Sequence, residues 1–178
     1  MPSQWLKIRE TQVYKGWRGI IQKEFELPGQ RRAVYDVFDN ATFVTVAAQT
    51  VLGDFILVRQ FRPGPEMELL SFVEGYVDAG ESPEEAALRE LMEEAGYEAE
   101  SLVFLKEKRS AYSNERQLMF LASGCRETGK RRPDPDEFIE VVTFSVAELK
   151  GLMRNPGDNT FCNIDAAYLA LEALGESK

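Results

Sequence analysis

The sequence of 178 residues contains no histidine. This absence excludes Ser-His-Asp and Cys-His catalysis, and every metal site that requires an imidazole ligand. Cysteine is also scarce: only Cys125 and Cys162 occur, without a C-x-x-C spacing, which excludes a structural zinc site. We expect two buried, reduced thiols in a reducing cytosol in preference to a single disulfide. Chemistry on a phosphate group would then depend on carboxylates, metal ions, and arginine or lysine.

Positive charge and long apolar runs are scarce as well. The chain has 21 basic against 30 acidic residues and a net charge of −9. Proteins that bind duplex nucleic acid or acidic membranes need a positive surface, so this balance disfavours both partners. No apolar run approaches the roughly 20 residues of a membrane-spanning helix, and residues 1–15 lack the apolar core of a signal peptide. We therefore expect a cytoplasmic protein that binds neither nucleic acid duplexes nor membranes.

The sequence does contain the material for one folded domain. Hydrophobic residues make up 44% of the chain, and no repeat, low-complexity tract or linker divides residues 1–178. Short apolar-rich runs between Gly, Pro and Asp turn signals predict strands. The expected strands are 19–27, 33–38, 42–48, 55–59, 69–73, 102–106, 117–121 and 139–144. Because strands outnumber helices, the pattern predicts an α+β fold.

Two helix starts carry a capping box, Ser-x-x-Glu, in which each side chain caps the backbone of the other residue. The first box begins at Ser82 and predicts a helix over 83–95, which Gly96 should end in a left-handed conformation. The second box predicts a helix from 145 to near 155. A third helix is expected over 165–174.

The first of these helices concentrates carboxylates on one side. With Glu90 set at zero on a helical wheel, Glu93 falls at about −60° and Glu94 at about +40°. The expected apolar stripe lies beside this arc, between roughly 100° and 160°, and consists of Leu88, Leu91 and Ala95. Like charges at these spacings repel, which a solvated face tolerates and a bound divalent cation would offset.

The flanks of this helix decide between those two interpretations. Residues 75–97 read GYVDAGESPEEAALRELMEEAGY. This segment resembles the Nudix box, G-x5-E-x7-R-E-U-x-E-E-x-G-U with U bulky and aliphatic, and only Tyr97 at the last position departs from it. The resemblance implies an α/β/α sandwich on a mixed sheet, two or three Mg²⁺ or Mn²⁺ ions, and hydrolysis of a nucleoside diphosphate linked to another group. Carboxylate oxygens are the ligands that such hard cations prefer.

The resemblance also assigns roles within the box. It implies that Glu90 and Glu94 are metal ligands, with Glu94 the most important, and that Glu93 activates water. The backbone carbonyl of Glu74 would add a further metal ligand. Arg89 is interpreted as a residue that orients the glutamates and not as a phosphate ligand.

Outside the box, the chain is similar to the ADP-ribose and nucleoside-diphosphate-sugar pyrophosphatases. The similarity lies in segments 14–16, 25–29, 58–63 and 136–141. Arg59 and Arg62, three residues apart in or just after a strand, are interpreted as ligands of the substrate's phosphates, for which arginine is well suited, and the alternative is a surface arginine pair. Glu137 is expected to reach the metals and take the proton of the attacking water, and Glu115 is its competitor for this role.

By the same resemblance, residues 1–40 form an antiparallel strand extension that pairs two copies into a homodimer, and residues 41–178 form the catalytic core. Trp5, Tyr14 and Trp17 would then lie near the dimer interface.

Two departures from the subfamily leave the substrate open. Residues 71–74 read SFVE where the subfamily has Glu-Leu-Pro-Ala, and Tyr112 lies where a tyrosine is associated with dinucleoside polyphosphate hydrolases. The main expectation is Mg²⁺-dependent hydrolysis of ADP-ribose or a related nucleoside diphosphate sugar to a nucleoside monophosphate and a sugar phosphate. The alternatives are a dinucleoside polyphosphate hydrolase, or a non-catalytic nucleotide-binding regulator, which the intact box disfavours. The base, the sugar and the number of metal ions stay undetermined.

Overall fold

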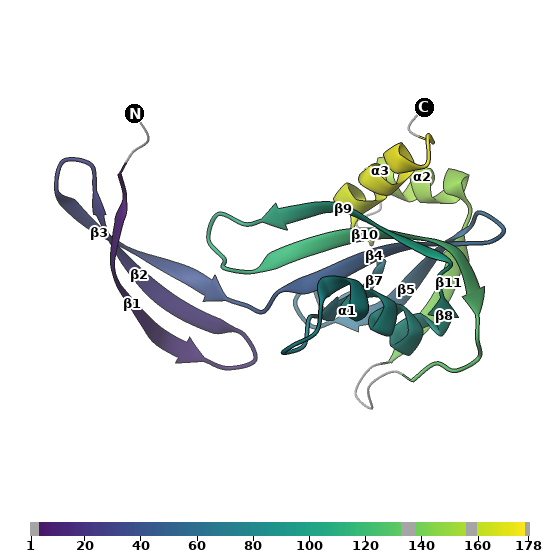
Figure 1. Cartoon of the computed structure of the whole chain (residues 1–178), viewed down its shortest axis with the longest axis horizontal. Coiled ribbons are helices and arrows are strands. Elements are labelled where there is room, and N and C mark those ends of the chain that lie inside the picture. Colours follow the sequence, from purple (N-terminus) through teal and green to yellow (C-terminus); the bar gives the residue numbers. More distant parts are fainter. Residues whose placement is uncertain (1–3, 133–137, 156–159, 177–178) are drawn as a thin grey trace. The chain divides into compact units, whose positions relative to one another are not determined.

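The computed structural model describes residues 4–132, 138–155 and 160–176 (Figure 1). The chain forms two compact units. The first comprises residues 1–42 and 108–117, and the second comprises residues 43–107 and 118–178. Strands predominate over helices in the described residues, so the α+β class is confirmed.

The first unit contains a three-stranded antiparallel sheet in the order β1-β2-β3. Its strands are β1 (Leu6–Lys15), β2 (Gly19–Leu27) and β3 (Arg31–Asp39). The β2–β3 pairing runs without interruption from Gly19↔Asp39 to Leu27↔Arg31, and β2 has the expected bounds. Every residue of β1 is exposed, and apolar and polar residues alternate only over residues 6–9, too short a run to mark the strand in the sequence. The expected N-terminal strand extension is thereby confirmed.

The second unit contains an eight-stranded sheet with the central order β11-β5-β4-β10-β8. Strand β6 pairs with β5, β7 with β4, and β9 with β10. These strands are β4 (Phe43–Thr50), β5 (Phe55–Arg62), β6 (Met67–Ser71), β7 (Val73–Tyr76), β8 (Tyr97–Glu98), β9 (Ser101–Arg109), β10 (Arg116–Glu127) and β11 (Ile139–Phe144). The helices are α1 (Pro83–Glu90), α2 (Val146–Arg154) and α3 (Ile164–Ala173).

Each face of this sheet buries its own apolar cluster. On one face, Ala86 and Leu91 from the first helical segment pack with Val44 and Val46 of β4. On the other face, α2 and α3 pack with Phe55 and Leu57 of β5. The alternation of side chains along a strand supplies both clusters at once, because successive residues point to opposite faces. Helices therefore cover both faces, and the expected α/β/α sandwich is confirmed (Figure 1).

The helix that begins with the first capping box differs from the expected one in its second half. The box at Ser82 is present, and Gly96 ends the helical segment with φ 78°. However, α1 ends at Glu90, and Leu91–Ala95 form a π-helical turn. Such turns are rare in proteins, and those that occur are often found at functional sites.

The buried side of this helix agrees only in part with the helical wheel: Leu91 and Ala95 of the expected apolar stripe are buried. Leu88, expected in the apolar stripe, is 42% exposed, whereas Glu94 is only 5% exposed. Ala86 and Ala87, at about −40° and +60° on the same wheel, are fully buried. The buried face is thus rotated from the expected stripe toward the carboxylate arc, where the small alanines let the helix approach the sheet. Glu94 is carried into the interior as a consequence.

The strand expected over 69–73 is divided in the structure. Strand β6 pairs with β5 from Arg62↔Met67 to Val58↔Ser71, and β7 pairs with β4 from Val46↔Val73 to Phe43↔Tyr76. Phe72 is the single residue between β6 and β7. Strands β4 and β5 pair with each other only at Ala48↔Ile56 and Gln49↔Phe55. Beyond these two pairs the strands separate, β5 pairs with β6, and β4 pairs with β7.

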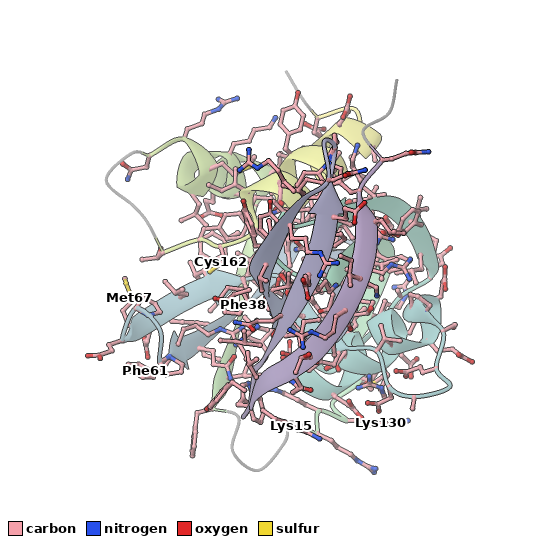
Figure 2. The ribbon with its side chains drawn as sticks, turned by 90° about the vertical axis from the view of Figure 1, so that its left-hand side faces the viewer. Lys15, Phe38, Phe61, Met67, Lys130 and Cys162 are labelled. Atoms are coloured by element: carbon pink, nitrogen blue, oxygen red, sulfur yellow. The ribbon has the colours of Figure 1, made fainter. Side chains whose placement is uncertain are left out.

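Both thiols are free, but only one is buried. Burial raises the pKa of Cys125 to about 11. Cys162 is exposed, so the expectation of two buried thiols is wrong for this residue. It lies beside β6, where its backbone N–H donates to the carbonyl of Leu70 at 2.9 Å (Figure 2).

None of the described helices has the length and apolar character that crossing a membrane requires.

Candidate active site

The Nudix-like segment places Arg89 among three carboxylates. Its Nε donates to Glu81 Oε1 at 2.8 Å, and its Nη1 donates to Glu90 Oε1 at 2.7 Å and to Glu93 Oε2 at 2.9 Å. Its Nη2 also donates to the carbonyl of Tyr76. These bonds, that to Glu81 foremost, raise the pKa of Arg89, and the same bond lowers the pKa of Glu81. The guanidinium therefore ties the loop before α1 to two of the carboxylates on the helix.

Glu90 lies against the backbone of β7. A Cβ added to Gly75 would stand 1.8 Å from the Glu90 carboxyl carbon, which means that the carboxyl occupies the space that a side chain would fill. Gly75 does not have a positive φ, so this close approach is what requires a glycine here. The first glycine of the box thus has a physical function, which is to form a cradle for the first carboxylate of the helix.

Glu94 and Glu93 differ in their exposure to solvent. Glu94 is buried in the π-helical turn, and its Oε2 accepts a hydrogen bond from the backbone N–H of Glu74 at 3.3 Å. The Glu93 side chain is 44% exposed, and its backbone carbonyl accepts from the N–H of Arg132 at 3.1 Å. A buried carboxylate and a more accessible one are therefore adjacent on one helical segment.

The side chain of Glu74 points away from the carboxylates of the helix. Its Oε1 accepts from Thr45 Oγ1 at 3.1 Å and from Asn163 Nδ2 at 2.7 Å. Its Oε2 lies 3.9 Å from Arg62 Nη2. Burial raises the pKa of the Glu74 carboxyl, and the two hydrogen bonds oppose this shift. The backbone of Glu74, and not its carboxylate, lies next to Glu94. This arrangement agrees with the expectation that a metal ligand at Glu74 would be its backbone carbonyl.

The donor set fits a divalent cation. Glu90, Glu93 and Glu94 could supply hard oxygen ligands from one helical segment, and the Gly75 cradle holds the first of them against β7. Among the described residues, however, no three acidic or thiol side chains are gathered closely enough to enclose a metal ion by themselves. Arg89 instead neutralises Glu90 and Glu93 in this arrangement.

Glu137, expected to complete the metal site, lies outside the described residues. The segments on each side of residues 133–137 are anchored near the helix. Thr128 N–H donates to the carbonyl of Gly96 at 2.9 Å, and Arg131 Nη2 donates to the carbonyl of Ile139 at 2.5 Å. Its competitor Glu115 lies in the first unit, where its Oε2 accepts from Asn40 Nδ2 at 2.7 Å.

The two arginines expected to bind phosphate each have an acidic neighbour. Arg59 Nη1 donates to Glu140 Oε2 at 2.7 Å, across the β5–β11 pair in which these residues are partners. Arg62 is near Glu74, as described above. Both arginine side chains are 36% exposed, so each can exchange its carboxylate for another anion.

Several partners of the site were not identified from the sequence. Asn163 and Thr45 contact Glu74, and Glu140 contacts Arg59. Asn163 precedes the first residue of α3, so its N-cap position was the one signal available in the sequence. Nothing in the local pattern around Thr45 or Glu140 indicates these contacts.

Comparisons with known proteins give a consistent result. A family profile described as NUDIX domain matches residues 39–163. The chain is 31% identical over 152 residues to an ADP-ribose pyrophosphatase of Bacillus subtilis (strain 168), which covers 83% of this chain and 82% of the relative. It is 30% identical over 154 residues to the ADP compounds hydrolase NudE of Escherichia coli (strain K12), covering 85% and 82%. A crystal structure of an ADP compounds hydrolase superposes with a TM-score of 0.82 at 26% identity and 97% coverage of both chains.

Proposed function

The chain belongs to the Nudix family and is a hydrolase, and from this premise we propose that it cleaves the pyrophosphate bond of ADP-ribose or a related nucleoside diphosphate sugar in a Mg²⁺-dependent reaction. Water adds to one phosphorus, the bridging P–O bond breaks, and the products are a nucleoside monophosphate and a sugar phosphate. The observation that carries this proposal is the carboxylate group of the box, cradled by Gly75 and oriented by Arg89. The similarity to relatives named for ADP-ribose and ADP compounds supports the choice of substrate class.

In the proposed mechanism, Glu90, Glu94 and the Glu74 carbonyl would hold two or three Mg²⁺ or Mn²⁺ ions. When bound, these cations supply Lewis-acid polarisation of the phosphoryl group and stabilise the leaving oxygen. Glu93, which is more exposed than Glu94, would orient and activate the attacking water, and Glu137 would take its proton. We assign the ligand role to Glu94 because it is buried, and the water-activating role to Glu93 because it is accessible to solvent.

Arg89 acts on the glutamates and not on the substrate. Its guanidinium already makes bonds to Glu81, Glu90 and Glu93, and few donors are left for a phosphate. The bonds from Arg89 to Glu81 hold the helix in place against its preceding loop, and Glu90 would hold the cation from there. We therefore assign Arg89 an orienting role.

Arg59 and Arg62 are proposed to bind the phosphates of the substrate. For this, the guanidinium of Arg59 must exchange Glu140 for a phosphate oxygen. The exchange is inexpensive, because an ion pair this exposed contributes about 0–1 kcal/mol, whereas bidentate contact with phosphate is stronger.

The proposal is tested by a substrate panel with product identification. ADP-ribose, GDP-mannose, UDP-glucose, NADH, diadenosine polyphosphates and nucleoside triphosphates are compared in Mg²⁺, with EDTA as the control. We expect a nucleoside diphosphate sugar to exceed nucleoside triphosphates in kcat/KM by at least roughly tenfold, about 1.4 kcal/mol of transition-state binding. Full turnover in EDTA would refute the metal chemistry, and a preference for triphosphates would refute the substrate class.

A second candidate function is hydrolysis of dinucleoside polyphosphates. Tyr112 favours it, since this side chain is 60% exposed in the first unit and is available to stack on a base. The same panel separates the two functions, because diadenosine polyphosphates would then be the best substrates. A Tyr112→Ala variant should lower kcat/KM for them and not for ADP-ribose.

We further propose that the protein is a cytoplasmic homodimer, with residues 1–40 as the dimerisation segment and residues 41–178 as the catalytic core. Both described thiols are free, which fits a reducing compartment. Strand β1 lies at an edge of its sheet and exposes large apolar side chains, with Trp17 after it 91% exposed. Isolated exposed aromatic residues are common, but a whole exposed strand of this kind favours pairing with a second copy. A monomeric mass by light scattering at micromolar concentration would contradict this proposal.

A further inference from the structure

The backbone N–H of Phe72, between β6 and β7, has no hydrogen-bond partner in either strand ladder. Residues Met67–Ser71 run along β5 toward the point where β4 and β5 separate, and Val73–Tyr76 run away from it along β4. Phe72, at this point, belongs to neither ladder and is fully buried. An unpaired buried N–H costs about 1–3 kcal/mol, so its partner matters for the position of β7.

Asn163 supplies that partner. Its Oδ1 accepts from the Phe72 N–H at 2.8 Å, and its Nδ2 donates to Glu74 Oε1 at 2.7 Å. Asn163 is 4% exposed and immediately precedes α3, whose Ala167 N–H donates to the Asn163 carbonyl at 2.9 Å. The amide side chain of Asn163 thus bonds both Phe72 and Glu74, and the Asn163 backbone is itself fixed at the start of α3.

Glu74 connects this contact to the carboxylates of the helical segment. The Glu74 side chain meets Asn163 and Thr45, while the Glu74 N–H meets the carboxylate of Glu94. The next residue, Gly75, forms the cradle of Glu90. A shift of β7 would therefore move the N–H that holds Glu94 and the cradle that holds Glu90 together.

We propose that Asn163 is a positioning residue for the metal site: through Phe72 and Glu74 it sets β7 against the carboxylates of Glu90 and Glu94 from the far side of the sheet. The inference rests on the proposed function, because it presupposes that these carboxylates bind a divalent cation. Residues that position metal ligands typically affect metal affinity by 10- to 100-fold when they are replaced.

The test is the affinity of the substrate-free protein for Mn²⁺, measured by electron paramagnetic resonance of the free ion. Asn163→Asp keeps an acceptor for the Phe72 N–H but sets a second carboxylate against Glu74. We expect Mn²⁺ to bind roughly tenfold or more weakly to this variant. Adding Glu74→Gln should recover most of the loss, because the glutamine amide can donate to Asp at position 163 while its oxygen still accepts from Thr45. Asn155→Asp, at the exposed end of α2, adds the same charge away from β7 and serves as the control.

The outcomes separate the inference from the function. If the unaltered protein does not bind Mn²⁺, the proposed metal site is wrong. If it binds Mn²⁺ and Asn163→Asp binds it equally well, the positioning role of Asn163 is refuted. Weak binding in both the single and the double variant, with melting temperatures like that of the control, also refutes the link through Glu74. Should Asn163→Asp not fold, Asn163→Ser, which is too short to reach both partners, is measured in the same way against the same expectation.

Discussion

Replacing Gly75 by alanine tests whether the Gly75 cradle serves the metal site. The new Cβ would stand 1.8 Å from the Glu90 carboxyl carbon and 1.9 Å from its Oε1. Ordinary contact between carbon atoms is about 3.5–4.0 Å, so the carboxyl must retreat by roughly 2 Å. Displacements of about 1 Å in a catalytic constellation can cost 10²-fold in rate. We therefore expect kcat with ADP-ribose to fall by roughly a hundredfold or more.

The same substitution should leave the fold intact. The atoms that it displaces belong to the end of a flexible side chain, and Gly75 has no positive φ that alanine would strain. Alanine should also stabilise the protein by roughly 0.4–1 kcal/mol, because it lowers the entropy of the unfolded chain. Thermal unfolding followed by circular dichroism measures this, in parallel with steady-state kinetics in Mg²⁺.

Gly151→Ala is a matched control, since a Cβ at this position in α2 meets no atom within 4 Å. It should gain stability to a similar extent and retain activity. An active Gly75→Ala enzyme, within a few-fold of the unaltered protein, would show that the position of Glu90 does not limit the reaction. The reasoning from the cradle to the metal site would then be wrong.

Three further predictions concern single side chains. Glu94→Gln should lower kcat on the order of 10² or more and weaken Mn²⁺ binding, since it removes the charge of a buried ligand at constant volume; a near-normal rate in a folded variant would contradict this. Glu137→Gln should lower kcat at least roughly a hundredfold with little change in KM, while Glu115→Gln should cost far less; the reverse order in parallel kinetics would exchange their roles. Ser145→Ala should destabilise the protein by about 1 kcal/mol at pH 7. Its bonds hold the pKa of Glu148 below the ordinary value of 4.5, so this cost should shrink as pH falls below about 4.5, and a cost in thermal melts that grows on acidification would refute it.

Local signals were sufficient for most of the elements. Both capping boxes are formed, and β2 and β11 have the expected bounds. These features depend on residues three or four positions apart or on alternation within one strand, which the sequence displays directly. Strand β1 shows such alternation only over its first four residues and is exposed throughout, so the local pattern does not predict it.

For the helix of the Nudix box, a helical wheel predicts only part of the buried surface. The wheel correctly predicts burial of Leu91 and Ala95, but Leu88 is exposed and Ala86, Ala87 and Glu94 are buried in addition. The end of the helix is a π-turn, in which the rotation per residue differs from the one that the wheel assumes. Burial of Glu94 was therefore beyond a wheel calculation, although the identity of the residue was not.

The sequence by itself determined the family and the candidate site residues of the Nudix box, because the spacing of the box is a local property of residues 75–97. Only the tertiary structure decided what holds them. Gly75 meets Glu90, Arg59 meets Glu140, and Asn163 meets Glu74 across separations at which no periodic pattern links the partners. These contacts arise because the sheet stacks distant segments against one another, and their energy comes from burial and hydrogen bonding that exist only once the segments have packed.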